Sequence, residues 1–216
     1  MITTIYLIRH SKTISKDEYV YLNNDISDSR VTQVQNEKII LSIEGEKLSK
    51  KLSDMNCLNK IDRIYSSNYV RAMQTAKYIA CNNGIKTIID SRFGERKLGN
   101  LEKLYEMGEN KNYGYVGEQL LDENLKNVDG ESALDVRIRF KEAIEDVIRN
   151  NEGKNIVVVS HGAAIKFYLK EYCKIIYNSD EVYLTYNENK INTNSPCVIK
   201  VTYDGFDLKN IEEINE

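Results

Sequence analysis

The chain has 216 residues, of which 41% are hydrophobic and 29% charged, and its formal net charge at pH 7 is −3. This length and composition suffice for a buried core, and they exclude a disordered or collagen-like chain. The small negative charge argues against nucleic-acid or anionic-membrane partners, because both bind through a strong excess of Lys and Arg.

Short apolar runs alternate with helical patterns along most of the chain. The expected strands cover residues 5–8, 61–65, 85–89, 156–159, 197–203 and 206–211. Helices are expected to begin at Ser42, at Ser66 and Ser67, at Ser132, and at Ala163; Ser often caps a helix N-terminus by accepting a free backbone N–H. This alternation predicts an α/β fold, specifically a three-layer α/β/α sandwich with a mostly parallel sheet.

The end of the chain has a different pattern. Asp204-Gly205 separates the last two expected strands, and this dipeptide is typical of a tight antiparallel hairpin. The polar stretches 12–40 and 177–194 carry no clear pattern, and no element is predicted there. Because no Pro-rich linker divides the chain, we expect one domain over residues 1–216 with an inserted, lid-like segment at about 91–130.

Cysteine usage and hydropathy bear on the compartment. None of the four cysteines forms a CxxC pair, and all lie in or beside apolar stretches, so we expect buried free thiols in a reducing compartment. No apolar run reaches the ~18 residues of a membrane span. We therefore expect a cytoplasmic protein without a membrane partner.

The only two histidines, His10 and His161, each follow an expected buried strand directly. In open α/β sheets, ligands bind beyond the carboxyl ends of the strands, so both imidazoles are expected to reach one crevice. Arg9 precedes the first histidine, and Gly162 follows the second where a helix begins. A glycine at that point permits close approach of the backbone to a ligand.

Arg71 falls in the first turn of the helix that follows the strand at 61–65. Taken alone, an arginine there fits a solvated helix face. Together with Arg9, both histidines and two helix N-termini, it predicts an oxyanion site, because free N–H groups and Arg forks suit phosphate.

Leu7–Thr13 reads LIRHSKT and resembles the L-[IV]-R-H-G-x-T signature of the histidine phosphatase superfamily, also called the phosphoglycerate mutase-like family. The long segment 66–76, SSNYVRAMQTA, resembles S-S-x-x-x-R-A-x-Q-T-A of the same family. Further matches follow in family order at 41–45, 95–102, 130–132 and 159–162. The resemblance spans most of residues 5–167.

This resemblance implies that His10 is a nucleophile that forms a phosphohistidine, since a neutral imidazole can attack phosphorus. Arg9, Arg71 and His161 would then stabilise the charge on the transferring phosphoryl group. The resemblance also implies that Glu95 donates a proton to the leaving alcohol and then activates water.

Several details of this assignment stay open at the level of sequence. Thr13 is expected to donate a hydrogen bond into the pocket, and Glu102 is the alternative acid if Glu95 is a surface carboxylate. Glu131 and Ser132 fit helix capping. Two departures from the family pattern are Ser11 in place of the usual Gly and Leu101 in place of an aromatic residue. If position 11 requires a positive φ, Ser costs about 1–2 kcal/mol.

Residues 100–130 contain three Lys and no Arg against seven acids. An acidic lid would repel a trianionic substrate, which favours hydrolysis of a small-molecule phosphate ester. The alternatives are phosphoryl transfer of the phosphoglycerate mutase type and a non-catalytic phosphate-binding protein, which Ser11 alone supports. No H-x-H or D-x-D pair accompanies the motifs, so we expect no metal and no cofactor.

Overall fold

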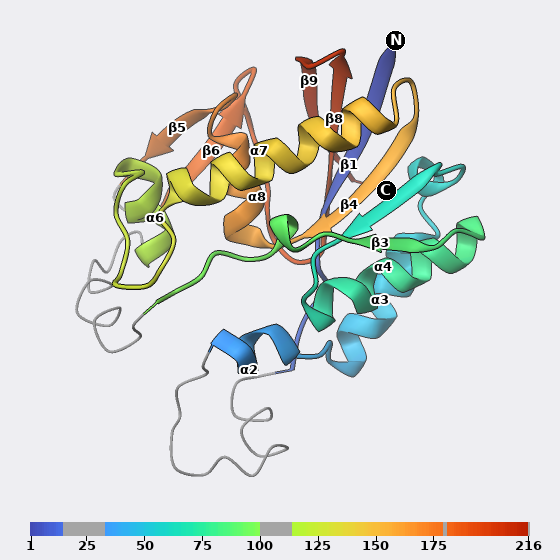
Figure 1. Ribbon diagram of the computed structural model, residues 1–216, viewed down its shortest axis with the longest axis horizontal. Helices are drawn as coiled ribbons and strands as arrows, with labels where there is room; N and C mark the ends of the chain where they lie inside the picture. Colours follow the sequence, from blue (N-terminus) through green and yellow to red (C-terminus); the bar gives the residue numbers. More distant parts are fainter. Residues whose placement is uncertain (15–32, 100–113, 179–180, 216) are drawn as a thin grey trace.

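The computed structural model describes residues 1–14, 33–99, 114–178 and 181–215 (Figure 1). Its main element is a six-stranded sheet with the order β3-β2-β4-β1-β8-β9. The strands of this sheet are β1 (Ile2–Arg9), β2 (Arg63–Ser66), β3 (Thr87–Ile89), β4 (Asn155–Ser160), β8 (Cys197–Asp204) and β9 (Asp207–Ile214).

Strand directions divide this sheet into two parts. β4 lies between β1 and β2 and is parallel to both, and β2 is parallel to β3. β8 runs antiparallel to β1 and pairs with β9 as a hairpin. The prediction of a mostly parallel sheet with a C-terminal antiparallel hairpin is confirmed.

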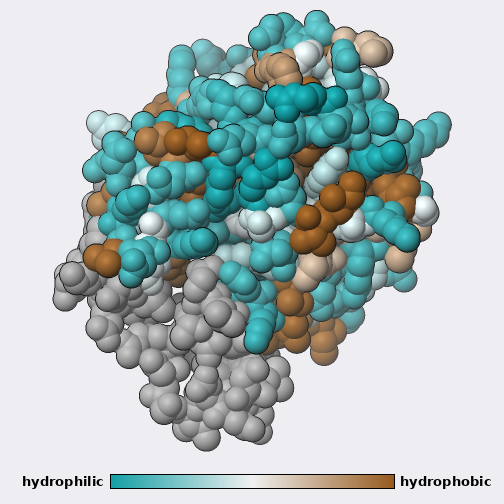
Figure 2. Space-filling view, viewed as in Figure 1, coloured by the Kyte–Doolittle hydropathy of each residue, from teal (hydrophilic) through white to brown (hydrophobic). Residues whose placement is uncertain are grey.

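Helices cover both faces of the sheet, as the three-layer prediction requires (Figure 1). α3 (Ile43–Ser53) and α4 (Val70–Asn83) lie on one face, where Leu52 and Ala72 share a core with Ile8 of β1. α7 (Ala133–Asn150) and α8 (Gly162–Leu169) lie on the other, where they pack with Leu7. Neighbouring residues of a strand point to opposite faces, so β1 supplies both cores. Hydrophilic side chains dominate the surface in Figure 2.

The helix starts follow the capping chemistry in two of the expected cases. The Ser42 side chain accepts the Gly45 N–H at the start of α3, and Ser132 forms a capping box with Asp135 at the start of α7. The expected serine cap of α4 is wrong: its N-cap is Tyr69, whose side chain makes no capping bond. The hydroxyl of the nearby Ser67 contacts the ring of His161, in the site described below.

The stretches without a predicted element hold most of the remaining structure. They contain α2 (Gln33–Lys38), β6 (Val182–Tyr186) and β7 (Asn189–Lys190). β6 and β7 form a separate three-stranded antiparallel sheet with β5 (Lys174–Tyr177), which lies at the start of the second stretch. These strands escape a hydropathy reading because few of their residues are buried: only Val182 and Leu184. Two short 3₁₀ helices, at Asn56–Leu58 and Ser91–Phe93, and α6 (Gly114–Leu121) complete the described elements.

The thiols and the helices bear on the expected compartment. All four cysteines are unbonded, but only Cys197 is buried, and Cys81 is exposed near the end of α4. The expectation of four buried thiols is therefore wrong, because Cys81 lies on the side of α4 that faces away from the core. Among the described residues, none of the helices combines the length and the apolar character that crossing a membrane requires.

Candidate active site

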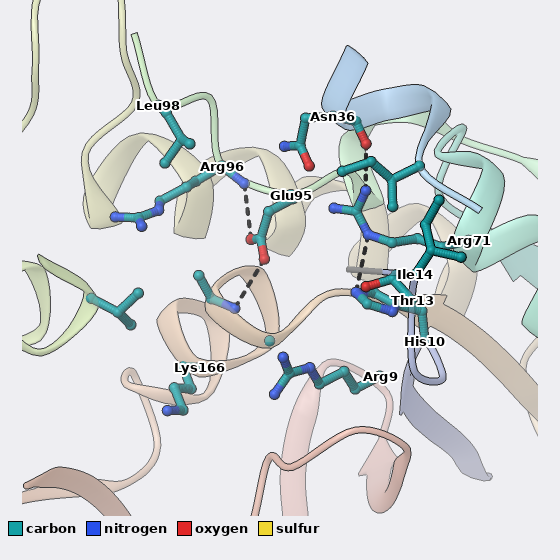
Figure 3. Close-up of a pocket in the computed structure, with 14 residues that line it drawn as sticks. Arg9, His10, Thr13, Ile14, Asn36, Arg71, Glu95, Arg96, Leu98 and Lys166 are labelled. Atoms are coloured by element: carbon teal, nitrogen blue, oxygen red, sulfur yellow. Dashed lines mark hydrogen bonds between the residues drawn. The ribbon is translucent and has the colours of Figure 1, made fainter. Parts of the chain in front are cut away.

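A cavity of about 420 Å³ opens beyond the carboxyl ends of β1 and β4 (Figure 3). Parallel strands that lie side by side end at the same edge of the sheet, which brings residues far apart in sequence to one place. All but one of the predicted site residues line this cavity: Arg9, His10, Thr13, Arg71, Glu95 and Gly162. The exception, His161, is fully buried and does not line the cavity, although its ring packs against that of His10.

His10 follows β1 directly and is only 8% exposed. Its Nδ1 lies 2.7 Å from the carbonyl oxygen of Ser11. A carbonyl can only accept, so Nδ1 carries the proton and Nε2 keeps a lone pair. Arg71 Nε donates to that Nε2 at 3.1 Å. Burial, together with the positive charge of Arg71, lowers the pKa of His10 to about 3, so the ring is neutral near pH 7.

His161 stands edge-on to His10, with 5.1 Å between the ring centroids. Its Nε2 lies 2.8 Å from the hydroxyl of Ser67, which also accepts the N–H of Tyr69. Nδ1 of His161 is buried and has no hydrogen-bond partner among the described residues. Burial, followed by the charge of Arg71, holds the pKa of His161 well below its usual range. The two rings therefore form a neutral pair, and the Nδ1 of the buried ring is unsatisfied within the described part of the chain.

Two arginines flank this pair. Arg71, in the first turn of α4, is 5% exposed and donates from Nη1 to the carbonyl of Asn36 at 2.5 Å. Arg9, the last residue of β1, donates from Nη1 to the carbonyl of Thr193 at 2.5 Å. The Arg9 Nε is buried and unpaired in the described part of the chain. Neither guanidinium is hydrogen-bonded or ion-paired to a carboxylate among the described residues, so both can bind an anion.

Glu95 places its carboxylate at the start of α8 (Figure 3). Its Oε1 accepts the N–H groups of Arg96 and Ala164, each at 3.0 Å, and Oε2 accepts that of Ala163 at 3.3 Å. A negative group is favoured at a helix N-terminus, where free N–H groups and the helix dipole meet. The sequence predicts that this N-terminus contributes to a phosphate site, but here its Ala163 and Ala164 N–H groups donate to the carboxylate of Glu95.

Glu131 has a contact that the capping pattern does not predict. Ser132 caps α7, while the Glu131 carboxylate pairs with Arg139 at 2.9 and 3.0 Å and accepts the Lys97 N–H at 2.8 Å. Arg139, in turn, donates to three carbonyls of the loop before Lys97: those of Arg92, Gly94 and Glu95. The Glu131–Arg139 pair thus fixes the loop on both sides of Glu95.

The glycine and serine positions in the two histidine motifs also differ from expectation. A Cβ on Gly162 would lie 2.9 Å from Cζ of Arg9, so the glycine makes room for the guanidinium rather than for a ligand. Ser11 is buried and is absent from the residues with positive φ, so no backbone strain arises there. Its N–H donates to Thr75 Oγ1 at 3.0 Å.

Some sequence expectations fall elsewhere. Leu101 and Glu102 lie outside the described residues. The described acids of residues 100–130 do not line the cavity: Glu118, Asp122, Glu123 and Asp129. Two cations that the sequence reading overlooked, Arg96 and Lys166, do line it. Lys166 offered a signal, because a charged residue stands there inside an otherwise apolar helix.

Within the described ranges, His, Cys, Asp and Glu side chains form no group of three or more that could hold a metal ion. The cationic groups of the cavity are side chains of the protein itself.

This fold and this pair of histidines between two arginines define a class of protein. Residues 5–211 match the histidine phosphatase superfamily (branch 1), and the chain belongs to that family. It is similar to the probable phosphoglycerate mutase GpmB of Enterobacter sp. (strain 638), at 28% identity over 163 residues, which are 74% of this chain and 70% of that protein. Phosphoglycerate mutase-like protein 4 of Arabidopsis thaliana is 28% identical over 172 residues, or 75% of this chain and 67% of that protein.

Solved structures share the fold over nearly the whole chain. A mycobacterial glucosyl-3-phosphoglycerate phosphatase superposes with a TM-score of 0.70 at 14% identity, covering 99% of this chain and 97% of that one. A putative alpha-ribazole-5'-P phosphatase from Escherichia coli K-12 gives a TM-score of 0.64 at 17% identity, covering 99% and 96%.

Proposed function

We propose that this protein hydrolyses the phosphate monoester of a small metabolite through a phosphohistidine at His10. The observation that carries the proposal is the hydrogen bond of His10 Nδ1 to the Ser11 carbonyl, which leaves the Nε2 lone pair at the cavity. The ring is neutral near pH 7, so no proton has to leave before Nε2 attacks phosphorus. Phosphatases and mutases both occur among the similar proteins.

In the first step, His10 Nε2 forms a bond to phosphorus while the bond between phosphorus and the ester oxygen breaks. Glu95 first takes up a proton and then gives it to the departing oxygen, so that an alcohol leaves. In the structure, Arg71 Nε donates to His10 Nε2 at 3.1 Å. When Nε2 bonds to phosphorus, a phosphate oxygen replaces it as the acceptor of this hydrogen bond. The buried, unpaired Arg9 Nε and His161 Nδ1 supply further groups for the phosphoryl oxygens.

In the second step, water attacks the phosphorus of the phosphohistidine. The Glu95 carboxylate takes a proton from that water, the bond between nitrogen and phosphorus breaks, and inorganic phosphate leaves. The lone pair returns to Nε2, and Glu95 is again protonated for the next cycle. Thr13, at the cavity wall, is in place to hydrogen-bond the phosphate.

The cations of the cavity also support a reaction without a metal ion, because Arg9 and Arg71 can neutralise the phosphoryl charge themselves. We expect activity to survive excess EDTA and to be blocked by vanadate, which mimics five-coordinate phosphorus. Activity that disappears in EDTA and returns with Mg²⁺ or Zn²⁺ would contradict this part of the proposal. The unbonded cysteines suit a reducing compartment, which we take to be the cytoplasm.

The central test uses His10→Ala and a phosphate ester with a good leaving group. We expect turnover to fall about 1,000-fold or more, because the nucleophile is lost. In the wild-type chain, a radiolabelled ester should leave an acid-labile, base-stable phosphoryl group that His10→Ala lacks. Thermal unfolding of both chains checks that the variant folds. Labelling or turnover that persists in His10→Ala would overturn the proposal, and transfer of the label to a second alcohol in place of water would identify a mutase.

A further inference from the structure

Residues 192–196 form a loop between β7 and β8, and we call this segment the strap. β8 pairs antiparallel with β1, and the pairing places Cys197, the first residue of β8, opposite Arg9, the last residue of β1. The strap therefore ends beside the point where the chain leaves β1 and continues into His10. It lies outside every motif that carries the family resemblance.

Two residues of the strap bind consecutive residues of the site. The carbonyl of Thr193 accepts Nη1 of Arg9 at 2.5 Å, and Oγ of Ser195 donates to the carbonyl of His10 at 2.6 Å. Thr193 is buried and Ser195 is half-buried, but neither lines the cavity. The strap thus holds the arginine and the histidine through groups that do not reach a ligand in the cavity.

The strap is itself held by bonds that involve neither Arg9 nor His10. The side-chain oxygen of Asn192 accepts the N–H of Asn194 at 2.8 Å, which is a turn of the kind that Asn stabilises. The N–H of Asn192 donates to Oε2 of Glu213 at 3.2 Å. Glu213 belongs to β9, which pairs with β8. The conformation of the strap is therefore anchored on the edge of the main sheet.

Ser195 holds one end of the peptide unit that joins His10 to Ser11. The carbonyl of this unit accepts the Ser195 hydroxyl, and its N–H donates to Oγ1 of Thr75 at 3.0 Å. The two hydroxyls come from different elements, the strap and α4, so a rotation of this peptide breaks at least one of the two bonds. The N–H of His10 is fixed separately, by the carbonyl of Ser160 at 2.9 Å.

The orientation of this peptide bears on which ring nitrogen of His10 is free to attack. Nδ1 of His10 lies 2.7 Å from the carbonyl of Ser11, so the proton on Nδ1 depends on the direction of the Ser11 backbone. If the peptide before Ser11 rotates, Nδ1 loses its acceptor. A neutral imidazole would then divide between two tautomers, and only one of them has its lone pair on Nε2.

We propose that Ser195 is a positioning residue for His10: its hydroxyl fixes the peptide after the histidine and thereby keeps Nε2 as the nitrogen with the lone pair. This inference rests on the proposed function for the role of Nε2 as nucleophile, but the tautomer of His10 can be measured without turnover. The Ser195 hydroxyl transfers no proton and does not touch the phosphate. Because Thr193 binds Arg9, one short segment places both residues.

The first test is nitrogen NMR of a chain with isotope-labelled histidine, which contains only two rings, His10 and His161. Protonated and unprotonated ring nitrogens resonate far apart, so the spectrum reports the tautomer of each ring, and His161→Gln assigns the signals. In the wild-type chain we expect the proton of His10 on Nδ1. In Ser195→Ala we expect the ratio of the His10 tautomers to change about fivefold, the effect of one neutral hydrogen bond, while His161 keeps its spectrum.

The second test is kinetic and uses p-nitrophenyl phosphate. We expect Ser195→Ala to lower kcat about 10-fold and to leave KM within about twofold, because the nucleophile is misplaced while the phosphate site remains. Ser195→Thr retains the hydroxyl and should stay within about threefold of the wild-type kcat. The matched control is Ser53→Ala, which removes a hydroxyl that donates to the carbonyl of Lys50 at 2.7 Å, outside the cavity. It should lower the unfolding temperature without changing the His10 tautomer or kcat.

An unchanged His10 tautomer ratio in Ser195→Ala would overturn the proposal, and so would a wild-type His10 that carries its proton on Nε2. Equal changes in Ser53→Ala would also overturn it, because they would indicate a general loss of stability. If Ser195→Ala does not fold, Ser195→Cys takes its place, since a thiol is a weaker donor and the same changes are expected. A wild-type chain without turnover contradicts the proposed function, whereas the tautomer ratio tests the strap alone.

Discussion

The two ends of the cavity are built in different ways. The inner end (Arg9, His10 and Arg71, with the buried His161 packed against His10) comes from residues that end a strand, directly follow one or lie in the first turn of a helix. The outer end (Arg96, Leu98, Val116 and Lys166) combines a loop, the short helix α6 and the first turns of α8. Both ends are cationic, but only the inner one contains His10, the nucleophile that we propose.

This difference separates the reaction from the choice of substrate. Groups fixed at the edge of a sheet keep their geometry when surface segments change, whereas loops vary readily between related chains. We therefore expect the inner end to be common to the histidine phosphatase family, and the outer end to differ between this chain and its relatives. Variants that affect one end without the other test this division.

After the loss expected for His10→Ala, the largest effect is expected at the boundary between the two ends, in Glu95→Gln. Gln retains an oxygen for the N–H groups at the start of α8 but cannot donate a proton as a carboxylic acid does. We expect turnover of alkyl phosphates to fall about 100-fold or more, and that of p-nitrophenyl phosphate much less, because nitrophenolate leaves without a proton. The measurement is the rate of phosphate release in the first turnover. An equal loss on both esters would move the proton-donor role to another acid, with Glu102 the first candidate.

A smaller effect is expected from Arg139→Lys, which weakens the clamp behind Glu95, meaning the Glu131–Arg139 pair and its hydrogen bonds to the loop of Glu95. Lys keeps the charge for Glu131 but cannot donate to three carbonyls in fork geometry. Displacement of a catalytic group by about 1 Å can cost up to about 100-fold, so we expect a loss of kcat between about 10-fold and 100-fold with little change in KM. Arg149→Lys, on the exposed end of α7, is the matched control. If the clamp is only structural, the unfolding temperature will fall while the ratio of alkyl to nitrophenyl rates stays unchanged.

The smallest effect concerns the stability of the inner end towards acid. The pKa of His10 is about 3 and that of His161 is also lowered, whereas an unfolded His titrates near about 6.5. Between these values the unfolded chain binds more protons, so stability is complete above about pH 6.5 and falls as the pH decreases towards 3. Each His contributes up to about 1.4 kcal/mol per pH unit.

Urea unfolding at pH values from 7.5 down to 5 measures this dependence. We expect His161→Gln to reduce the slope of unfolding free energy against pH, and Lys166→Met, at the outer end, to leave it unchanged. Identical slopes in the wild-type chain and in His161→Gln would show that the buried histidines are not kept neutral by the fold.

Sequence alone predicted the inner end well because its determinants are local. Each motif residue stands directly after an apolar run or in the first turn of a helix, and parallel strands that share one edge bring such positions together. The same reasoning predicted the sheet, its hairpin and the capping box at Ser132, since hydropathy period and turn chemistry act over a few residues. The backbone strain considered for Ser11 does not occur, because it depended on a positive φ that the motif cannot specify and that Ser11 does not adopt.

Only the tertiary structure determined which side chains from distant parts of the sequence contact one another at the site. Glu131 and Arg139 meet across the start of α7, and their bonds to the loop of Glu95 involve residues up to 47 positions apart. Ser67 bonds to His161 across 94 positions, and the acids of residues 118–129 turn away from the cavity while Arg96 and Lys166 line it. Composition gave this region an acidic character, but the charge that a ligand meets depends on which side chains face the cavity. That choice follows from how loops pack on the finished core, because contacts between distant segments leave no periodic pattern in the sequence.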